Sequence, residues 1–442
     1  MNELETHYKS LQSDWTVTDR SPDYRKLVVP DGNDDRAFHS WFRFKEAYSH
    51  RLPAVVLEEE GHRRSSPLRV LDPFCGSGTS LLSAIEFRAA QGRSAYVAGV
   101  ERSPLLQTIA SAKLEGLLGG ATLAEKVHNA AADVPREYAR IRRGELQTSS
   151  VTLNDPKYFP RAHVQSLLAL AEAIRAVSAG STQRVLLTAL ASCVEPAGRL
   201  RRDGRALRYE PGRIPVHPRL LFESRVKDMI RDMRAFTASN ASLAGVVVEG
   251  DARTADSLVG ARRFDVIMFS PPYPNNIDYT EVYKTESWAL SLWTSPSEMK
   301  AQRLRTLRSH PSLLFPDSYA YDTLPIAGDV RSLVSPLLDA IPDDRYTNGR
   351  RQLVRGYADD MLRVFQSCRR VVAQDGSLVY VVGNSLHGTG EHTFVIAADL
   401  LLARLAELAG WAVKEIRVAR QLKRRMSASQ FLRESVVTLK PV

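Results

Sequence analysis

The chain has 442 residues, of which 44% are hydrophobic and 25% charged, and its formal net charge is +10. This length allows two or three domains or one large domain with insertions, and the composition excludes a disordered or fibrous protein. The basic excess favours a polyanionic partner.

The cysteine content and the hydropathy of the chain exclude further classes of protein. The only cysteines are Cys75, Cys193 and Cys368, with no CxxC pair and no His/Cys cluster at zinc spacing, so we expect neither a disulfide framework nor a metal site. The first residues lack the apolar core of a signal peptide, and no uncharged apolar run approaches the ~20 residues that span a bilayer. We therefore expect a soluble, cytoplasmic protein with no metal and no membrane partner.

Short apolar runs rich in Val and Ile recur along the chain and predict strands buried on both faces of a parallel sheet. In chain order they cover residues 68–74, 95–101, 245–251, 264–273, 376–385, 411–419 and 434–441. Helix-like segments lie between several of these strands, at residues 80–88, 104–118, 356–372 and 393–408. This alternation predicts an α/β fold with right-handed crossovers.

Two stretches, 120–240 and 285–355, exceed ordinary connection lengths, so we expect them to be largely helical insertions and candidate target-recognition regions. In the first, Asp203-Gly204 predicts a tight turn between two basic arms. The remaining chain then divides into an N-terminal segment and a catalytic domain built from three pieces. The expected limits are 1–60 for the segment, and 61–119, 241–284 and 356–442 for the catalytic domain.

A glycine-rich turn follows the first predicted strand, in the sequence Asp-Pro-Phe-Cys-Gly-Ser-Gly-Thr at positions 72–79. In doubly wound sheets ligands bind at the carboxyl ends of the strands, where such a turn lets the backbone approach closely. The turn lacks the lysine of a phosphate-binding Walker loop and the G-x-G-x-x-G of a nicotinamide site. The candidate cofactor residues here are Asp72, Pro73, Phe74, Gly76, Gly78 and Thr79.

Two further acidic residues end the next two predicted strands. Glu101 lies where a carboxylate can accept both ribose hydroxyls of a nucleoside, and Asp251 lies at the same edge. Each could instead be a loop residue or a helix cap. Three acids at the ends of three consecutive strands nevertheless favour a cofactor site.

The most specific motif is Ser270-Pro271-Pro272-Tyr273, directly after the strand FDVIMF. Two prolines make the loop stiff and leave carbonyl acceptors in place of N–H donors. Such a loop suits a planar base with an amino group: the ring of Tyr273 would stack on the base, while Ser270 and a proline carbonyl would engage the amine hydrogens. Positioning and electrostatics could then promote attack by the amine without a strong general base.

Together these motifs resemble the S-adenosylmethionine-dependent amino-methyltransferases that act on nucleic acids. The resemblance implies a Rossmann-like, seven-stranded class I methyltransferase sheet with helices on both faces, and S-adenosylmethionine as cofactor. The glycine loop would wrap the methionine part, Glu101 would hold the ribose, and Asp251 would contact the adenine amine. Residues 38–53 are similar to the family segment that packs against the methionine end.

In that family serine in the first place of the catalytic motif is associated mainly with cytosine N4, and aspartate with adenine N6. The cofactor motif precedes the catalytic motif here, whereas many serine-type cytosine enzymes have the reverse order, which weakens the choice of base. Methylation at cytosine C5 needs a cysteine, in that family within a Pro-Cys dipeptide, and none occurs.

A duplex base must be extruded to reach the methyl donor, so basic side chains are expected beside the catalytic loop. Solvated charged faces are the competing interpretation. The candidate nucleic-acid contacts are Arg201, Arg202, Arg205, Arg303, Arg305, Lys423 and Arg424.

The favoured function is thus a site-specific DNA methyltransferase with DNA as partner, and with a cognate restriction or defence protein as a further possible partner. Adenine N6 is the alternative base, and an RNA methyltransferase of the tRNA guanine-N2 type is the alternative substrate class. Ser270 counts against protein-glutamine methyltransferases, which typically have asparagine there. A non-catalytic, cofactor-binding DNA-binding module is the alternative of another class.

Overall fold

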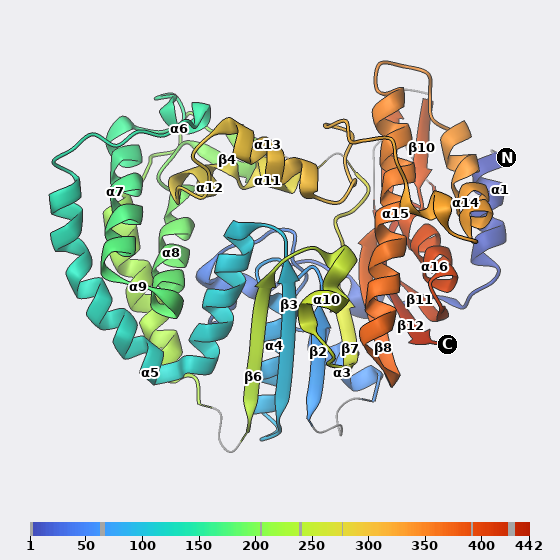
Figure 1. Ribbon diagram of the computed structural model, residues 1–442, viewed down its shortest axis with the longest axis horizontal. Coiled ribbons are helices and arrows are strands. Elements are labelled where there is room, and N and C mark those ends of the chain that lie inside the picture. The colour runs from blue at the N-terminus through green and yellow to red at the C-terminus, as the bar shows by residue number, and fades with distance from the viewer. Residues whose placement is uncertain are drawn as a thin grey trace.

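A mixed eight-stranded sheet forms the centre of the protein (Figure 1). The computed structural model describes residues 3–61, 67–203, 206–237, 241–275, 277–389, 392–422 and 429–442. Strand β12 runs antiparallel to both of its neighbours, and the other pairs are parallel. The spatial order is β1 (Val17–Asp19), β11 (Trp411–Gln421), β12 (Arg433–Pro441), β8 (Val372–Gly383), β7 (Phe264–Phe269), β2 (Leu68–Asp72), β3 (Ala95–Glu101) and β6 (Leu243–Glu249).

This arrangement confirms the predicted α/β class. All seven predicted strands are present, and β1 adds a short parallel edge strand beside β11. One expected element is wrong at its start: the helix predicted over 393–408 begins only at Ala398, as α16 (Ala398–Leu408). The β-branched run before it forms β10 (His392–Ile396), which pairs with β9 (Ser385–Thr389) in a hairpin.

Helices cover both faces of the sheet because alternate side chains of each central strand point to opposite sides. On β7, Val266 and Met268 join one buried cluster, whereas Ile267 and Phe269 join the other. The first cluster contains α3 (Leu52–Glu59), α4 (Thr79–Ala89) and the first part of α5 (Pro104–Ile141). The second contains α1 (Glu3–Gln12), α10 (Ala255–Val259), α14 (Ala327–Asp339), α15 (Thr347–Val371) and α16.

Residues 120–240 are mainly helical in their described parts and lie beyond β6, at one side of the sheet (Figure 1). Helix α5 bends at Gly120, whose φ of +49° is in the left-handed region, and continues into this unit. Arms β4 (Leu200–Asp203) and β5 (Ala206–Tyr209) pair antiparallel, while the predicted turn residue Gly204 lies outside the described residues. The other elements are α6 (Val151–Asn154), α7 (Arg161–Val177), α8 (Gly180–Val194) and α9 (Pro218–Ala235).

The segment after β7 lies over the carboxyl ends of the strands, where Figure 1 shows α11 and α13 above β6 and β3. Its elements are α11 (Tyr279–Val282), α12 (Lys284–Ala289), α13 (Pro296–Arg305) and η4 (Ala320–Thr323). The N-terminal segment contains α2 (Ser21–Tyr24), η1 (Asn33–Asp35) and η2 (His39–Trp41), and η3 (Ala252–Thr254) follows β6.

Candidate active site

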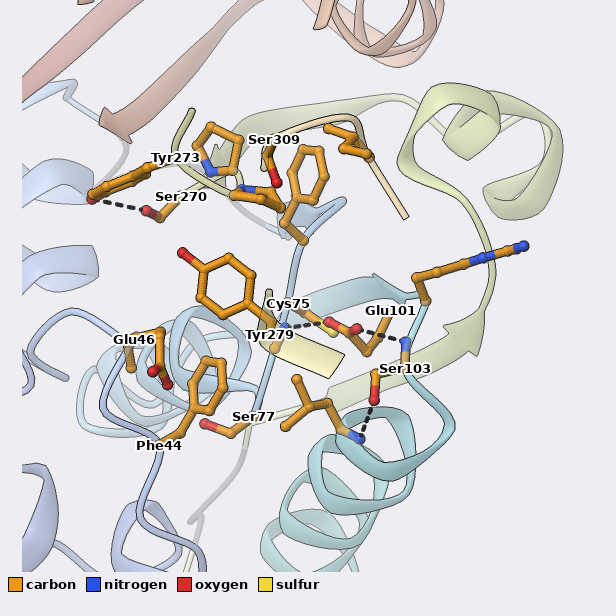
Figure 2. Close-up of a pocket in the computed structure, with 18 of the residues that line it drawn as sticks. Phe44, Glu46, Cys75, Ser77, Glu101, Ser103, Ser270, Tyr273, Tyr279 and Ser309 are labelled. Carbon is orange, nitrogen blue, oxygen red and sulfur yellow. Dashed lines mark hydrogen bonds between the residues drawn. The ribbon is translucent and has the colours of Figure 1, made fainter. Parts of the chain in front are cut away.

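One large pocket opens at the carboxyl ends of β2, β3 and β7 and has a volume of about 320 Å³. Every residue predicted to bind cofactor lines it except Gly78, and so do all four residues of the predicted catalytic motif. Figure 2 shows Ser270 and Tyr273 on one side of the pocket, Glu101 and Ser103 on the other, and Tyr279 between them. The topology therefore brings the two motifs, almost 200 residues apart in sequence, into one pocket.

The glycine loop needs its glycines for backbone conformation and for close contact. Gly76 and Gly78 have φ values of +52° and +89°, and Gly78 caps α4 in the left-handed conformation. A Cβ on Gly76 would lie 2.9 Å from a ring carbon of Phe44. Residues 44–48 thus form a wall of the pocket directly against the loop, at the segment predicted to face the methionine end.

Two carboxyl groups, the buried Asp72 and the half-buried Glu101, line the pocket without a cationic partner among the described residues. Asp72 accepts hydrogen bonds from the Ser80 hydroxyl and from the Phe74 N–H at 2.9 Å. Glu101 accepts N–H bonds from Gly76 at 2.9 Å and from Ser103 at 2.8 Å. Burial raises the pKa of each to about 7. A ligand with positive charge and hydroxyl donors would compensate both groups, which fits S-adenosylmethionine.

Asp251 lies at the same edge but has a partner. It caps η3 and forms an ion pair with Arg253, with 2.6 Å between Asp251 Oδ2 and a terminal guanidinium nitrogen. Arg253 is also paired with Asp360 at 2.8 Å. Burial alone would raise the pKa of Asp251, but the hydrogen bonds and charge of Arg253 outweigh burial and lower it. Contact between Asp251 and the adenine amine of the cofactor stays a prediction. In such a contact Asp251 would still be paired with Arg253.

The predicted catalytic loop, residues 270–273, is held by hydrogen bonds on its polar side chains. Ser270 Oγ lies 3.0 Å from the Val381 carbonyl oxygen and 3.2 Å from Tyr273 Oη, and Tyr273 donates its hydroxyl to Glu434 at 2.8 Å. The ring of Tyr273 lies against Gly383, where a Cβ would come within 2.7 Å of a ring carbon. Stacking of this ring on a target base remains a prediction.

The chain just after the motif is fixed from two sides. The Pro274 carbonyl accepts from Ser385 Oγ at 2.5 Å and lies 2.9 Å from His387 Nε2, both on the β9–β10 hairpin. The Asn275 N–H donates to the Ser309 carbonyl at 3.0 Å. The residues that make these contacts, Ser385, His387 and Ser309, are distant from the motif in sequence, and no sequence motif identified them.

Sequence reasoning also missed several polar residues of the pocket. Glu46 accepts from the Tyr283 hydroxyl, and burial raises its pKa. Burial lowers the pKa of His310, which lies 3.8 Å from Asp278. Asn275 and Asp278 line the same pocket. Asn275 and Asp278 lie close to the catalytic motif in sequence, and Glu46 lies within residues 38–53, but no motif marked these side chains individually.

The predicted basic contacts divide into different environments. Arg202 contradicts its prediction: its side chain is 5% exposed and paired with Glu195 and Glu286, so it cannot face a phosphate backbone. Arg303 is 18% exposed and compensated by Asp278 and Glu281. Arg201 is exposed with Glu210 at 3.4 Å, and Arg305 is exposed at the pocket and in no ion pair with described residues. Arg205, Lys423 and Arg424 lie outside the described residues.

Over the described ranges no helix is long and apolar enough to cross a membrane. The same part of the chain holds no group of three or more His, Cys, Asp or Glu side chains arranged for a metal ion. All three cysteines are buried and unbridged. Burial raises the pKa of the Cys75 thiol well above its usual value, as expected for a packing residue of the loop.

No family model matches the chain. Over 456 aligned residues it is 23% identical to the Type II methyltransferase M.BsoBI of Geobacillus stearothermophilus, covering 92% of this chain and 84% of that protein. It is also 23% identical to the Type II methyltransferase M.AvaI of Nostoc sp., over 89% of this chain and 83% of that one.

Among solved structures, the rRNA methyltransferase aviRa from Streptomyces viridochromogenes matches with a TM-score of 0.32 and 11% identity, covering 95% and 96% of the two chains. A TehB-like SAM-dependent methyltransferase from Corynebacterium glutamicum matches with a TM-score of 0.27 and 8% identity, covering 88% and 87%. Because both TM-scores are low, the fold assignment rests on the strand order and on the position of the pocket. The chain is thus similar over most of its length to Type II methyltransferases, and its pocket at the carboxyl ends of the strands fits S-adenosylmethionine as cofactor.

Proposed function

We propose that the chain is a site-specific DNA methyltransferase that transfers a methyl group to an exocyclic amino nitrogen, with cytosine N4 the favoured acceptor. The observation that carries the proposal is the presence of the Ser270–Tyr273 loop in the same pocket as the glycine loop and Glu101. The full-length similarity to Type II methyltransferases supports DNA as the substrate. A cognate restriction or defence protein remains a prediction of the resemblance.

The residues of the loop supply what an amine acceptor needs. The lone pair of an exocyclic amine is conjugated into the base, so hydrogen bonds that favour a pyramidal nitrogen make it available for attack. Pro271 and Pro272 have no N–H, so this stretch presents acceptors, and Ser270 Oγ has lone pairs to add. Bound S-adenosylmethionine supplies the activated methyl group. The residues hold the amine in line and accept its hydrogens.

The test of this function is methyl transfer from labelled cofactor to DNA and to tRNA in parallel. Label in DNA and none in tRNA is the expected result. Transfer to tRNA alone would assign the runner-up function. No transfer to either, by folded protein that binds the cofactor, would support the non-catalytic module and contradict the proposal.

Replacing Cys75 with alanine is expected to leave methyl transfer within a few-fold of wild type. The thiol is buried in the glycine loop, its pKa is raised by burial, and it lies against Gly99. Single-turnover assays on DNA check this. Abolished transfer by folded, cofactor-binding C75A would instead indicate a cysteine nucleophile and carbon methylation.

Replacing Arg305 with alanine is expected to weaken DNA binding and to reduce the slope of log affinity against log salt by about one. Arg305 is exposed at the pocket and has no acidic partner among the described residues. Fluorescence anisotropy at several salt concentrations measures both quantities. Arg370, a 63% exposed arginine near the end of α15 that does not line the pocket, provides the matched control R370A, whose slope should equal that of wild type. An unchanged slope in R305A would remove this residue from the DNA surface.

A further inference from the structure

A hydrogen-bonded chain of four side chains, all of which line the pocket, runs from the catalytic loop to the C-terminal strands. Ser270 Oγ is 3.2 Å from Tyr273 Oη, Tyr273 donates to Glu434 Oε1 at 2.8 Å, and Arg420 Nε donates to Glu434 Oε2 at 2.5 Å. Glu434 lies on β12 with a side chain only 5% exposed, whereas Arg420 on β11 is 38% exposed. The last two members come from the C-terminal strands, about 150 residues after the motif.

The donors and acceptors of this chain fix its direction. A carboxylate only accepts, so the single hydrogen of the Tyr273 hydroxyl goes to Glu434. Tyr273 Oη can then only accept from Ser270. The single hydrogen of Ser270 points to Tyr273 Oη or to the Val381 carbonyl, and in either case it points away from the substrate. Ser270 is thereby left with lone pairs for an incoming amine.

Packing keeps Tyr273 in this role. Gly383 leaves room for the ring, since any side chain there would collide with it. Burial, and then the charge of Glu434, raise the pKa of Tyr273 well above its usual value, so the phenol stays protonated and remains a donor. The chain is therefore preorganised before substrate binds.

We propose that Glu434 is the positioning residue of the methyl-transfer reaction, which makes Ser270 an acceptor for the amine and takes up the proton that the amine loses. The proposal rests on the amino-methyltransferase function proposed above. In the transfer, the carbon–sulfur bond breaks with its electron pair going to sulfur, and the amine lone pair forms the new N–C bond.

One N–H proton then moves to Ser270 Oγ as the serine proton moves to Tyr273 Oη and the tyrosine proton moves to Glu434. The net result is a neutral methylated amine and a protonated Glu434. The proton returns to solvent after product release.

The test compares E434Q, Y273F and the double variant in single-turnover methyl transfer to DNA. We expect each single variant to lose about 100-fold in rate, in the range of a removed acid–base group. The DNA KM and the cofactor Kd should stay within about twofold. The double variant should be no slower than either single one, because both cut the same chain. A merely structural role would instead lower cofactor affinity and thermal stability together with the rate.

Glu415 provides a matched control in the same pair of strands. It also accepts from a hydroxyl, Thr18 Oγ1 at 2.5 Å, and from an arginine, Arg417 Nε at 2.8 Å, but it lies outside the pocket. E415Q should transfer methyl groups at the wild-type rate.

Wild-type rates in E434Q, or losses that multiply in the double variant, would overturn the proposal. If E434Q fails to fold, Y273F provides the test, because this variant leaves the Glu434–Arg420 pair intact. A wild-type rate of methyl transfer in Y273F would then overturn the proposal. Absence of transfer by the wild-type protein would overturn the proposed function itself. An active wild type with an unimpaired E434Q would overturn only this inference.

Discussion

Replacing Ser270 with alanine is expected to slow methyl transfer by about 10²–10³-fold, the range seen when one preorganised polar contact to a reacting group is removed. The hydroxyl is bonded to Val381 and Tyr273 and lines the pocket, so its loss removes the acceptor for the amine and the start of the chain to Glu434. Cofactor affinity should remain within about twofold, since no cofactor residue contacts Ser270 Oγ by hydrogen bond. Single-turnover kinetics and cofactor titration separate the two effects.

The matched control is S83A. Ser83 is a buried serine on α4 whose hydroxyl donates to the Thr79 carbonyl at 2.8 Å, and it does not line the pocket. The loss of this hydroxyl removes the same kind of hydrogen bond without touching the Ser270–Tyr273 loop, so the rate of methyl transfer should be unchanged. A comparable slowing in both variants would mean that stability, and not the acceptor, explains S270A.

Replacing Glu101 with glutamine is expected to weaken cofactor binding by about 100-fold and to flatten its pH dependence. An ionised carboxylate that accepts two ribose hydroxyls makes two charge-assisted bonds, each contributing roughly 1.5–3 kcal/mol. Burial raises the pKa of Glu101, and that of Asp72, to about 7. Calorimetric titration at several pH values measures the effect.

The direction of the pH dependence follows from the thermodynamic link between proton binding, folding and ligand binding. Because the pKa of each group in the folded chain is above its ordinary value of 3.8 for Asp72 and 4.5 for Glu101, the stability that these groups contribute is present below those values and is lost as the pH rises through about 7. A cationic ligand with hydroxyl donors favours the ionised forms, so the wild-type Kd should fall as the pH rises from 6 to 8, with proton release on binding. Tighter binding at lower pH would contradict the assignment of Glu101 to the ribose.

Much of the sheet could be predicted because its central strands are buried on both faces and therefore read as continuous apolar runs. The hairpin β9–β10 was missed for a physical reason. Its second strand, His392–Ile396, lies just before α16, and its short β-branched run was absorbed into the helical pattern of Ala398–Leu408. The segment before α16 is a strand because it pairs with Ser385–Thr389, which lies outside the predicted helix.

The pocket shows the same division between local and long-range information. The two motifs could be recognised because each is a contiguous stretch that ends a strand. Glu46 and Glu434 could not, because what makes them part of the site is the packing of the N-terminal segment and of β12 against the loop. Arg202 was misjudged for the converse reason: an arginine in a basic run looks exposed until Glu195 and Glu286 are seen to surround it.

The central claim is methylation of an exocyclic amino nitrogen in DNA. Nucleoside mass spectrometry of DNA from cells that express the wild-type protein or S270A tests it most directly, and sequencing of the modified sites would add the target sequence. We expect N4-methylcytosine in wild-type DNA and almost none with S270A. N6-methyladenine would correct the base but keep the chemistry. 5-Methylcytosine, or methylated RNA with unmodified DNA, would contradict the account.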